Sequence, residues 1–195
     1  MNRAAKVTTK PLINAGDGIN QHPSQGLLDM YTIKKEHGRL KNLKIGFGGD
    51  LLNSRTLRSL LPLLRLYEGN KFYFISPKEL ELPREFIKEL KESGAEFEEL
   101  RILEEALPHL VVLYMTRVQK ERFRDIGEYE TVKDLFILKT DHLKILKPDA
   151  IIMHALPKIN EIEEEVDKDP RAAYFRQAEN GLYARMALLT YILEI

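Results

Sequence analysis

The fold is decided by one stretch that begins apolar and ends polar, Leu110-Val111-Val112-Leu113-Tyr114-Met115-Thr116-Arg117-Val118-Gln119-Lys120-Glu121-Arg122. Its first part, Leu110 to Leu113, is an unbroken apolar run, which is typical of a parallel strand buried on both faces. The chain then presents Thr, Arg, Gln and Lys in quick succession. Because open α/β sheets bind ligands at the carboxyl ends of their strands, we expect these polar side chains to form a binding site.

Arg117 and Gln119 lie two residues apart, so in an extended segment their side chains point the same way. An arginine fork beside a glutamine amide suits a ligand that carries a carboxylate and a neighbouring polar group. A solvated loop with a surface ion pair is the competing interpretation, since short motifs often match by chance.

Outward from this stretch, apolar runs alternate with amphipathic segments along the whole chain. The pattern predicts strands at residues 43–47, 71–76, 96–100, 110–113 and 149–153, and helices near 23–37, 53–66, 83–93, 103–107 and 140–146 before a final helix. Strand 96–100 is expected at a sheet edge, where its charges would oppose further pairing. Pro62 predicts a kink or early end in the second helix, and residues 124–133 are expected to form a charged loop. Regular alternation predicts a doubly wound, Rossmann-like parallel sheet of about five strands flanked by helices, in one domain spanning residues 1–195.

Composition excludes several classes of function. Lysine and arginine together number 30, as do aspartate and glutamate, so no basic excess indicates a nucleic-acid or membrane partner. The lack of cysteine excludes disulfides, thiolate zinc sites and a cysteine nucleophile, and it fits a cytoplasmic location. No apolar run is long enough to span a bilayer. The glycines from Gly46 to Gly49 invite a dinucleotide-binding interpretation, but the motif G-x-G-x-x-G fails at Leu51.

Five stretches resemble the aspartate carbamoyltransferase catalytic chain, and they follow one another in that family's order. Residues 114–122 are similar to its aspartate-recognition loop. The other four are Asn14-Ala15-Gly16-Asp17-Gly18 with Gln21-His22-Pro23-Ser24-Gln25, Gly49-Asp50 with Ser54-Arg55-Thr56, His154-Ala155-Leu156-Pro157, and Tyr174-Phe175 with Gln177-Ala178 and Asn180-Gly181. Together they cover nearly the whole chain, and five matches in order are far more specific than one.

The resemblance implies an aspartate site held by two arginines. In that family, the residues matching Arg55 and Arg117 each grip one aspartate carboxylate, because a guanidinium fork meets a carboxylate bidentately. Gln119 binds in the same site, and Arg122 supports it. Arg55 has a competing interpretation as an ordinary first-turn helix residue, although a cation near the positive end of a helix is mildly unfavourable.

The resemblance also implies two catalytic residues, His22 and Gln25. In that family, the residue matching His22 donates a hydrogen bond to the carbamoyl oxygen, where negative charge grows in the transition state. The residue matching Gln25 holds the carbamoyl nitrogen. Taken alone, a histidine at a helix start is more often an ordinary structural residue.

A turn at residues 154–158 completes the implied site. The resemblance predicts a cis bond between Leu156 and Pro157, with backbone carbonyls that face the substrate amines. Lys158 supports this turn where the family has arginine, and Ala155 stands where it has proline. Lysine keeps the charge of arginine but lacks its planar fork.

The family's carbamoyl-phosphate domain, with its Ser-Thr-Arg-Thr phosphate cradle, has no counterpart in the sequence. Residues 1–12 are therefore expected to be a remnant of the linker to that domain. The implied function is the aspartate-binding half of an aspartate carbamoyltransferase of pyrimidine biosynthesis, inactive alone, with L-aspartate and carbamoyl phosphate as substrates. The resemblance implies no metal and no cofactor. Possible protein partners are a complementary carbamoyl-phosphate domain and further catalytic subunits.

Two other functions stay open at this point. One is a non-catalytic aspartate- or dicarboxylate-binding module. The other is a relative of ornithine carbamoyltransferase, which would need an acidic partner for a basic substrate side chain. Without the other domain, Leu182 and Leu189 of the final helix are expected to be partly exposed, and the chain to be monomeric or weakly associated.

Overall fold

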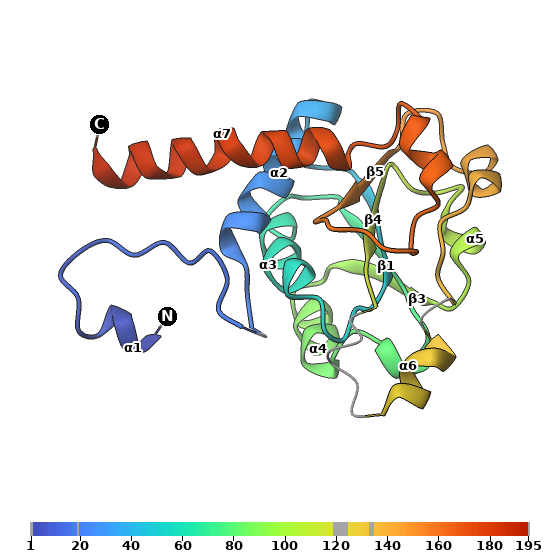
Figure 1. Cartoon of the computed structure of the whole chain (residues 1–195), viewed down its shortest axis with the longest axis horizontal. Coiled ribbons are helices and arrows are strands. Elements are labelled where there is room, and N and C mark those ends of the chain that lie inside the picture. The colour runs from blue at the N-terminus through green and yellow to red at the C-terminus, as the bar shows by residue number, and fades with distance from the viewer. Residues whose placement is uncertain (1, 19, 119–124, 133–134, 195) are drawn as a thin grey trace.

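The computed structural model describes residues 2–18, 20–118, 125–132 and 135–194, which are arranged around a parallel sheet (Figure 1). The sheet consists of β1 (Lys44–Gly49), β2 (Lys71–Ile75), β3 (Glu96–Leu100), β4 (Val112–Thr116) and β5 (Ile151–His154). Their spatial order is β3-β2-β1-β4-β5, and each neighbouring pair is parallel. Chain order reverses between β1 and β4. The carboxyl ends of these two strands therefore form the switch point at which such sheets bind ligands.

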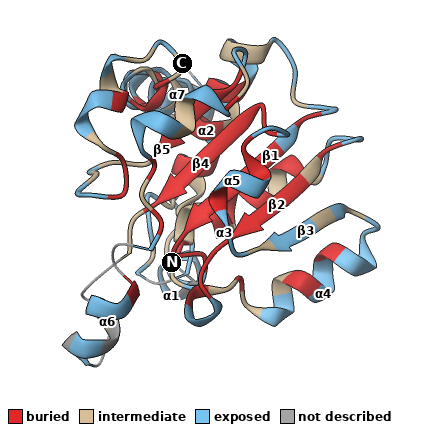
Figure 2. Ribbon diagram, turned by 90° about the vertical axis from the view of Figure 1, so that its right-hand side faces the viewer, coloured by how far each residue is buried: buried red, intermediate tan, exposed pale blue. Residues whose placement is uncertain are grey.

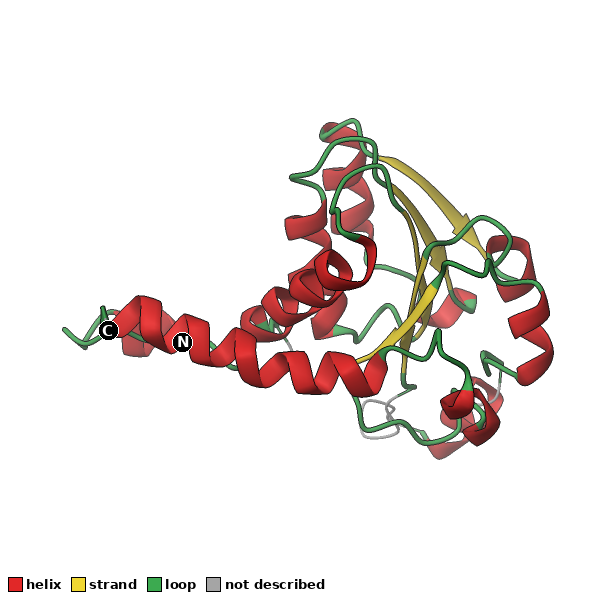
Figure 3. Cartoon of the chain, turned by 90° about the horizontal axis from the view of Figure 1, so that it is seen from above, coloured by secondary structure: helices red, strands yellow, loops and turns green. Residues whose placement is uncertain are grey.

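The strand side chains alternate between two apolar clusters, one on each face of the sheet. Along β4, Val112 and Tyr114 enter the first cluster, while Leu113 and Met115 enter the second. The first cluster is covered by α2 (Pro23–His37), α3 (Arg55–Leu64) and α4 (Arg84–Glu92). The second is covered by α5 (Leu103–Ala106) and the 3-10 helices η3 (Thr140–Lys144) and η4 (Glu164–Lys168). Figure 2 shows the central strands buried, and Figure 3 shows helices on both sides of the sheet. The predicted doubly wound α/β fold is confirmed.

Two helices begin where the sequence places local start signals. Pro23 occupies the first position of α2, where its missing N–H costs nothing, and α2 ends at Gly38 in the left-handed conformation. Ser54 caps α3, since its side chain accepts a hydrogen bond of 3.3 Å from the Leu57 N–H. Pro62 lies within α3, which continues to Leu64 rather than breaking at the proline. The buried leucines of α3 hold this last turn despite the one backbone bond that proline removes.

One expectation is wrong, because residues 126–132 form a helix, α6, rather than a charged loop. Asp125 explains the helix start. Its side chain accepts a 2.9 Å hydrogen bond from the Gly127 N–H, as a helix-capping residue does. Val132 at the other end is buried. A capping aspartate and a buried valine both favour the helix over a loop. The helix expected near 140–146 is the shorter 3-10 helix η3.

Strand β3 lies at the edge of the sheet, as predicted, and is rich in carboxylates. Glu96, Glu98 and Glu99 are exposed along it. Glu98 pairs with Lys71 of β2 at 2.6 Å, and Glu99 pairs with Arg84 at 3.2 Å. Charges on an edge strand discourage pairing with another chain.

The final helix, α7 (Tyr174–Leu193), begins against β5 and α2 and then extends beyond the rest of the molecule (Figures 1 and 3). Its apolar stripe is open to solvent: Leu182 is 59% exposed and Leu189 is 48% exposed. This confirms the expected exposure. Even so, within the described residues no helix is both long and apolar enough to cross a membrane.

Replacing the α7 stripe tests whether it causes self-association. We expect a monomer or a weak oligomer whose apparent mass falls on dilution, because exposed apolar patches associate without defined geometry. A variant with Leu182→Gln and Leu189→Gln should associate less than the unaltered chain in static light scattering. A trimer that persists at low concentration and survives both substitutions would contradict this prediction.

Candidate functional site

A cavity of about 230 Å³ lies at the carboxyl edge of the sheet, where chain order reverses between β1 and β4. It combines the start of α2, the start of α3, the end of β4 and the turn after β5. The lining residues are His22, Gln25, Ser54, Arg55, Thr56, Tyr114, Met115, Thr116, Arg117, His154, Ala155, Leu156 and Pro157. Strands that end side by side thus bring together residues far apart in the sequence.

Arg55 reaches the cavity from the first turn of α3. Its Nη1 donates a hydrogen bond of 3.2 Å to the Gly18 carbonyl, which ties α3 to the loop before α2. Gly16 of that loop has a φ of 124°, a backbone conformation that residues with a Cβ rarely adopt. A Cβ at Gly16 would also lie 3.3 Å from Arg55 Nη1. Glycine at this position therefore leaves room for the guanidinium group.

His22 lies immediately before α2, and its backbone is fixed by α3. The His22 N–H donates a 2.7 Å hydrogen bond to Ser59 Oγ. Partial burial, followed by the positive charges of Arg55 and Arg185, lowers the pKa of the His22 imidazole below its usual value. The ring is therefore neutral at neutral pH, so it carries one N–H donor and one acceptor nitrogen.

Arg117 follows the last residue of β4, where a close backbone contact holds the strand ends together. Thr116 Oγ1 donates to the Gly48 carbonyl at 2.9 Å and lies 3.2 Å from that of Asp50. Gly49 adopts a φ of 106°, and a Cβ there would lie 2.3 Å from the Thr116 carbonyl oxygen. β1 and β4 can approach this closely only because position 49 is glycine. Arg117 and Arg55 thereby line the same cavity, as predicted.

The turn after β5 contains the predicted cis peptide bond between Leu156 and Pro157. Leu156 has a φ of 55°, and its N–H donates a 2.8 Å hydrogen bond to His154 Nδ1. Because Nδ1 accepts, the neutral imidazole carries its proton on Nε2. This nitrogen lies 2.8 Å from Glu161 Oε1, without a well-aligned hydrogen bond. Burial tends to raise the pKa of Glu161, but the contact with His154 and hydrogen bonds from the backbone N–H groups of Glu161 and Ile159 outweigh burial and lower the pKa.

Behind the cavity, one fully buried carboxylate joins three elements. Asp29 Oδ1 accepts hydrogen bonds from Gln25 Nε2 at 2.9 Å and from Gln177 Nε2 at 2.6 Å, and Oδ2 accepts one from the Tyr114 hydroxyl at 3.0 Å. Gln177 Oε1 in turn accepts the His154 N–H at 2.9 Å. We call Asp29, Gln25, Tyr114 and Gln177 the Asp29 hub. It links α2, β4 and α7, and it reaches β5 through the backbone.

Sequence reasoning missed Asp29 and Glu161. A usable signal existed for Asp29, because it lies four residues after Gln25 and therefore on the same face of the helix. Glu161 gave no comparable signal, since its partner His154 belongs to a different segment.

Six predicted site residues line the cavity together: His22, Gln25, Arg55, Arg117, Leu156 and Pro157. Lys158 does not join them. Its ammonium lies 3.1 Å from Asp167 and 3.3 Å from the Ile162 carbonyl, so it braces the turn without lining the cavity. Gln119 and Arg122 lie outside the described residues.

Comparison with known proteins places the chain in a family. The family model for the Asp/Orn binding domain of aspartate/ornithine carbamoyltransferase matches residues 41–192. The model for the carbamoyl-P binding domain of the same family matches residues 1–35. The second match reaches well beyond residue 12, where the sequence alone placed the end of a linker.

Individual relatives agree with this assignment. Chloroplastic aspartate carbamoyltransferase 1 of Pisum sativum is 50% identical over 192 residues, which cover 98% of this chain and 50% of the relative. The catalytic subunit of M. jannaschii aspartate transcarbamoylase is 46% identical, with a TM-score of 0.91, over 99% of this chain and 62% of that one. Aspartate transcarbamoylase from Trypanosoma cruzi, in complex with aspartate and phosphate, is 36% identical, with a TM-score of 0.84, over 96% and 59%.

The chain spans between half and about three-fifths of the length of these relatives. The match to the Asp/Orn binding domain covers most of the residues, and it includes β1 to β5 and the arginines of the cavity. The chain belongs to the aspartate/ornithine carbamoyltransferase family.

Proposed function

We propose that the chain is the aspartate-binding part of an aspartate carbamoyltransferase of pyrimidine biosynthesis. In this reaction the aspartate amine attacks the carbonyl carbon of carbamoyl phosphate. A C–N bond forms, the bond from carbon to the phosphate oxygen breaks, and the amine loses a proton. The products are N-carbamoyl-L-aspartate and phosphate. One observation carries the proposal: Arg55, from the first turn of α3, and Arg117, directly after β4, line one cavity with His22.

The two guanidinium groups suit the two carboxylates of aspartate, because each can form a bidentate pair. A substrate with a cationic side chain, such as ornithine, would meet two positive charges in the same cavity. Within the described lining, no carboxylate faces the cavity to balance an ammonium group. This arrangement favours aspartate over ornithine.

His22 would stabilise the negative charge that develops on the carbamoyl oxygen. A neutral imidazole can donate its one N–H, and a single donor aimed at such an oxygen is worth about 2.7–4 kcal/mol in the transition state. Gln25 and the carbonyls of the turn after β5 would orient the carbamoyl and amino nitrogens. Proximity of the two substrates would supply much of the remaining rate.

The two family-model matches support a proposal for the domain organisation. We propose residues 41–192 as the aspartate-binding domain and residues 1–35 as a segment that belongs with the carbamoyl-phosphate domain. This segment is longer than the linker remnant of residues 1–12 expected from the sequence. We also propose the cytoplasm as the compartment; localisation of the tagged chain in its source cells tests this, because the pea relative is described as chloroplastic.

Aspartate binding should depend on Arg117. We expect weak binding to the unaltered chain, because Arg55 and Arg117 are only half-buried and water-exposed ion pairs are worth about 0–1 kcal/mol each. Arg117→Ala should weaken binding further, by up to about fivefold, in an NMR titration with L-aspartate. Arg84→Ala, which removes an arginine from the exposed surface near β3, is the matched control and should leave binding unchanged. Tighter binding of ornithine than of aspartate would overturn the proposal.

Carbamoyl transfer by the chain alone should be slow. The cationic residues that line the described cavity, Arg55 and Arg117, are both assigned to aspartate, so the phosphate of carbamoyl phosphate lacks a comparable grip there. Poorly held reactants forfeit much of the ~7–11 kcal/mol that orientation can supply. Adding a separately produced carbamoyl-phosphate domain of a relative should raise the rate, and His22→Ala should lower the raised rate by about 10²–10³-fold. Rapid formation of N-carbamoyl-L-aspartate by the purified chain alone would contradict this prediction. Aspartate binding without transfer in the mixture would indicate a non-catalytic binding module instead.

A further inference from the structure

Gln25 lines the cavity, but an amide side chain has two different ends, and their directions decide what it can recognise. The NH2 group only donates hydrogen bonds, whereas the oxygen only accepts them. From side-chain shape alone the two ends are nearly indistinguishable, so the orientation has to follow from the bonding partners. In this chain the partners behind Gln25 determine it.

The orientation is fixed by a chain of bonds that starts at a backbone N–H. The His154 N–H can only donate, so the atom of Gln177 that it contacts at 2.9 Å must be the oxygen. The NH2 of Gln177 therefore points at Asp29 Oδ1, 2.6 Å away. Oδ1 is thereby an acceptor, and any proton on this carboxyl group resides on Oδ2, beside the Tyr114 hydroxyl.

The same logic extends to Gln25. Its amide meets Asp29 Oδ1 at 2.9 Å, and because Oδ1 is an acceptor, Gln25 must present its NH2 to it. The amide oxygen is then the end that remains for the cavity. Asp29 is fully buried and Gln25 is buried beside it, so water does not compete for this bond as it does at a surface.

We propose that Asp29 is a positioning residue that holds the Gln25 amide with its oxygen toward the cavity, so that the site selects a ligand with an N–H donor there. The inference rests on the proposed function, in which the group placed at Gln25 is the carbamoyl NH2. An acetyl group has the same shape but offers a methyl group to the amide oxygen. The Asp29 hub thus makes the site selective for carbamoyl over acetyl groups, although Asp29 itself touches neither.

The first test measures the orientation without any ligand. In a spectrum of side-chain amides, the two Gln25 NH2 protons, assigned by their loss in Gln25→Met, should exchange slowly with water. Asp29→Asn keeps an oxygen at the Oδ1 position and should retain this protection. Asp29→Leu has a similar shape and no acceptor, and it should lose the protection. Fast exchange of the Gln25 amide in the unaltered chain would overturn the proposal, even if neither Asp29 variant folds.

The second test measures selectivity with two ligands that differ in one group, N-carbamoyl-L-aspartate and N-acetyl-L-aspartate. The unaltered chain and Asp29→Asn should prefer the carbamoyl ligand by about 2- to 12-fold in NMR titrations, the value of one hydrogen bond. In Asp29→Leu the ratio should approach one. If Asp29 had only a structural role, Asp29→Leu would weaken the binding of both ligands equally and leave the ratio of their affinities unchanged. That result would overturn the proposal. Failure of both ligands to bind the unaltered chain would refute the proposed function, while the amide spectrum would still decide the orientation.

Discussion

The free energy of unfolding of Asp29→Asn should rise relative to that of the unaltered chain by about 4 kcal/mol between about pH 4 and pH 8. Complete burial raises the pKa of Asp29 from 3.8 to about 7, although hydrogen bonds from Gln177, Tyr114 and Gln25 and the charge of Arg185 oppose the rise. Between these two pKa values, the folded chain keeps a proton on Asp29 that the unfolded chain has released. Rising pH therefore lowers the free energy of unfolding of the unaltered chain over this range. The decrease is complete once the pH exceeds about 7, the pKa of Asp29 in the folded chain.

Asparagine reproduces the protonated carboxyl group and cannot ionise. Its amide oxygen can accept hydrogen bonds from the NH2 groups of Gln25 and Gln177, and its own NH2 can donate one to the Tyr114 oxygen. The two proteins should therefore be similarly stable near pH 4 and should diverge as the pH rises. Urea unfolding at a series of pH values measures the difference in free energy directly. The contribution of carboxylates that both proteins share, such as Glu161 with its lowered pKa, cancels in this difference. A difference that stays flat with pH, or falls, would contradict this prediction.

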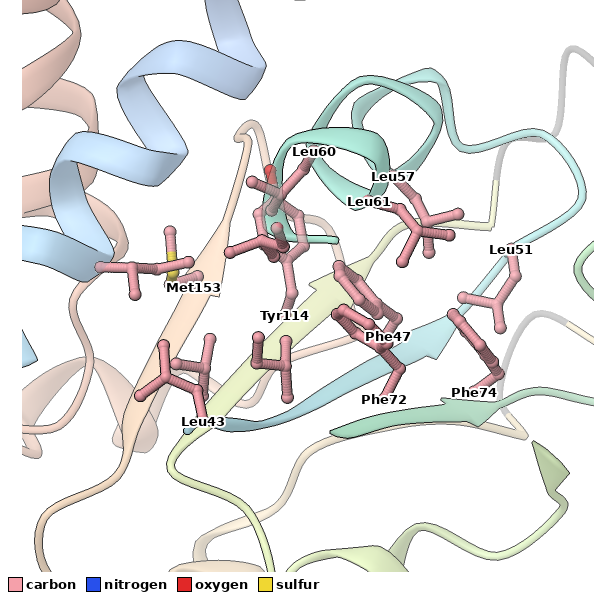
Figure 4. Close-up of a cluster of buried hydrophobic side chains, with 14 of the residues drawn as sticks. Leu43, Phe47, Leu51, Leu57, Leu60, Leu61, Phe72, Phe74, Tyr114 and Met153 are labelled. Atoms are coloured by element: carbon pink, nitrogen blue, oxygen red, sulfur yellow. The ribbon is translucent and has the colours of Figure 1, made fainter. Parts of the chain in front are cut away.

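Phe47→Ala should destabilise the fold by about 3–5 kcal/mol, because truncating a fully buried phenylalanine leaves a cavity that the sheet cannot fill. Phe47 lies on the central strand β1 and has no exposed surface. Its ring lies 6.0 Å from that of Phe74 and 6.0 Å from that of Tyr114, between strands on either side (Figure 4). Loss of the Phe47 ring would therefore also loosen Tyr114, and with it the Asp29 hub.

Phe175→Ala provides the matched control, since it removes an identical ring that is 52% exposed on α7. Chemical denaturation of the two variants should show that Phe175→Ala lowers the free energy of unfolding several times less than Phe47→Ala does. Equal costs would mean that the interior around β1 relaxes into the space left by Phe47.

Much of the fold could be predicted because its signals are local. The runs that became β1, β2, β4 and β5 are apolar enough to identify without knowledge of their neighbours, and the boundaries moved by only a few residues. Helix α6 was missed because a charged segment was taken for a loop, and the aspartate cap and the buried valine that favour the helix are not apparent from its charge pattern. The continuation of α3 past Pro62 depends on packing of leucines that the proline rule ignores.

The cavity was predictable where a residue follows a strand or starts a helix, as Arg117, Arg55 and His22 do. It was not predictable where the partners come together only in the folded chain. Asp29 receives donors from positions 25, 114 and 177. The four-residue spacing indicates only the contact with Gln25, and nothing in the sequence indicates the contacts with Tyr114 and Gln177. The sequence also could not show how Lys158 supports the turn after β5: its ammonium contacts Asp167 and the Ile162 carbonyl, and Lys158 does not line the cavity.

The acidic edge of the sheet has a consequence for handling the protein. In neutral buffer, β3 presents negative charge to any second molecule, and mutual repulsion keeps two such edges apart. Near the ordinary pKa of glutamate, about 4.3, much of that repulsion disappears while the strand can remain folded. Acid elution and storage would then remove this local guard against strand addition at β3. Low ionic strength at neutral pH preserves this local repulsion between β3 edges, although the chain as a whole has equal numbers of basic and acidic residues and so carries no net charge there.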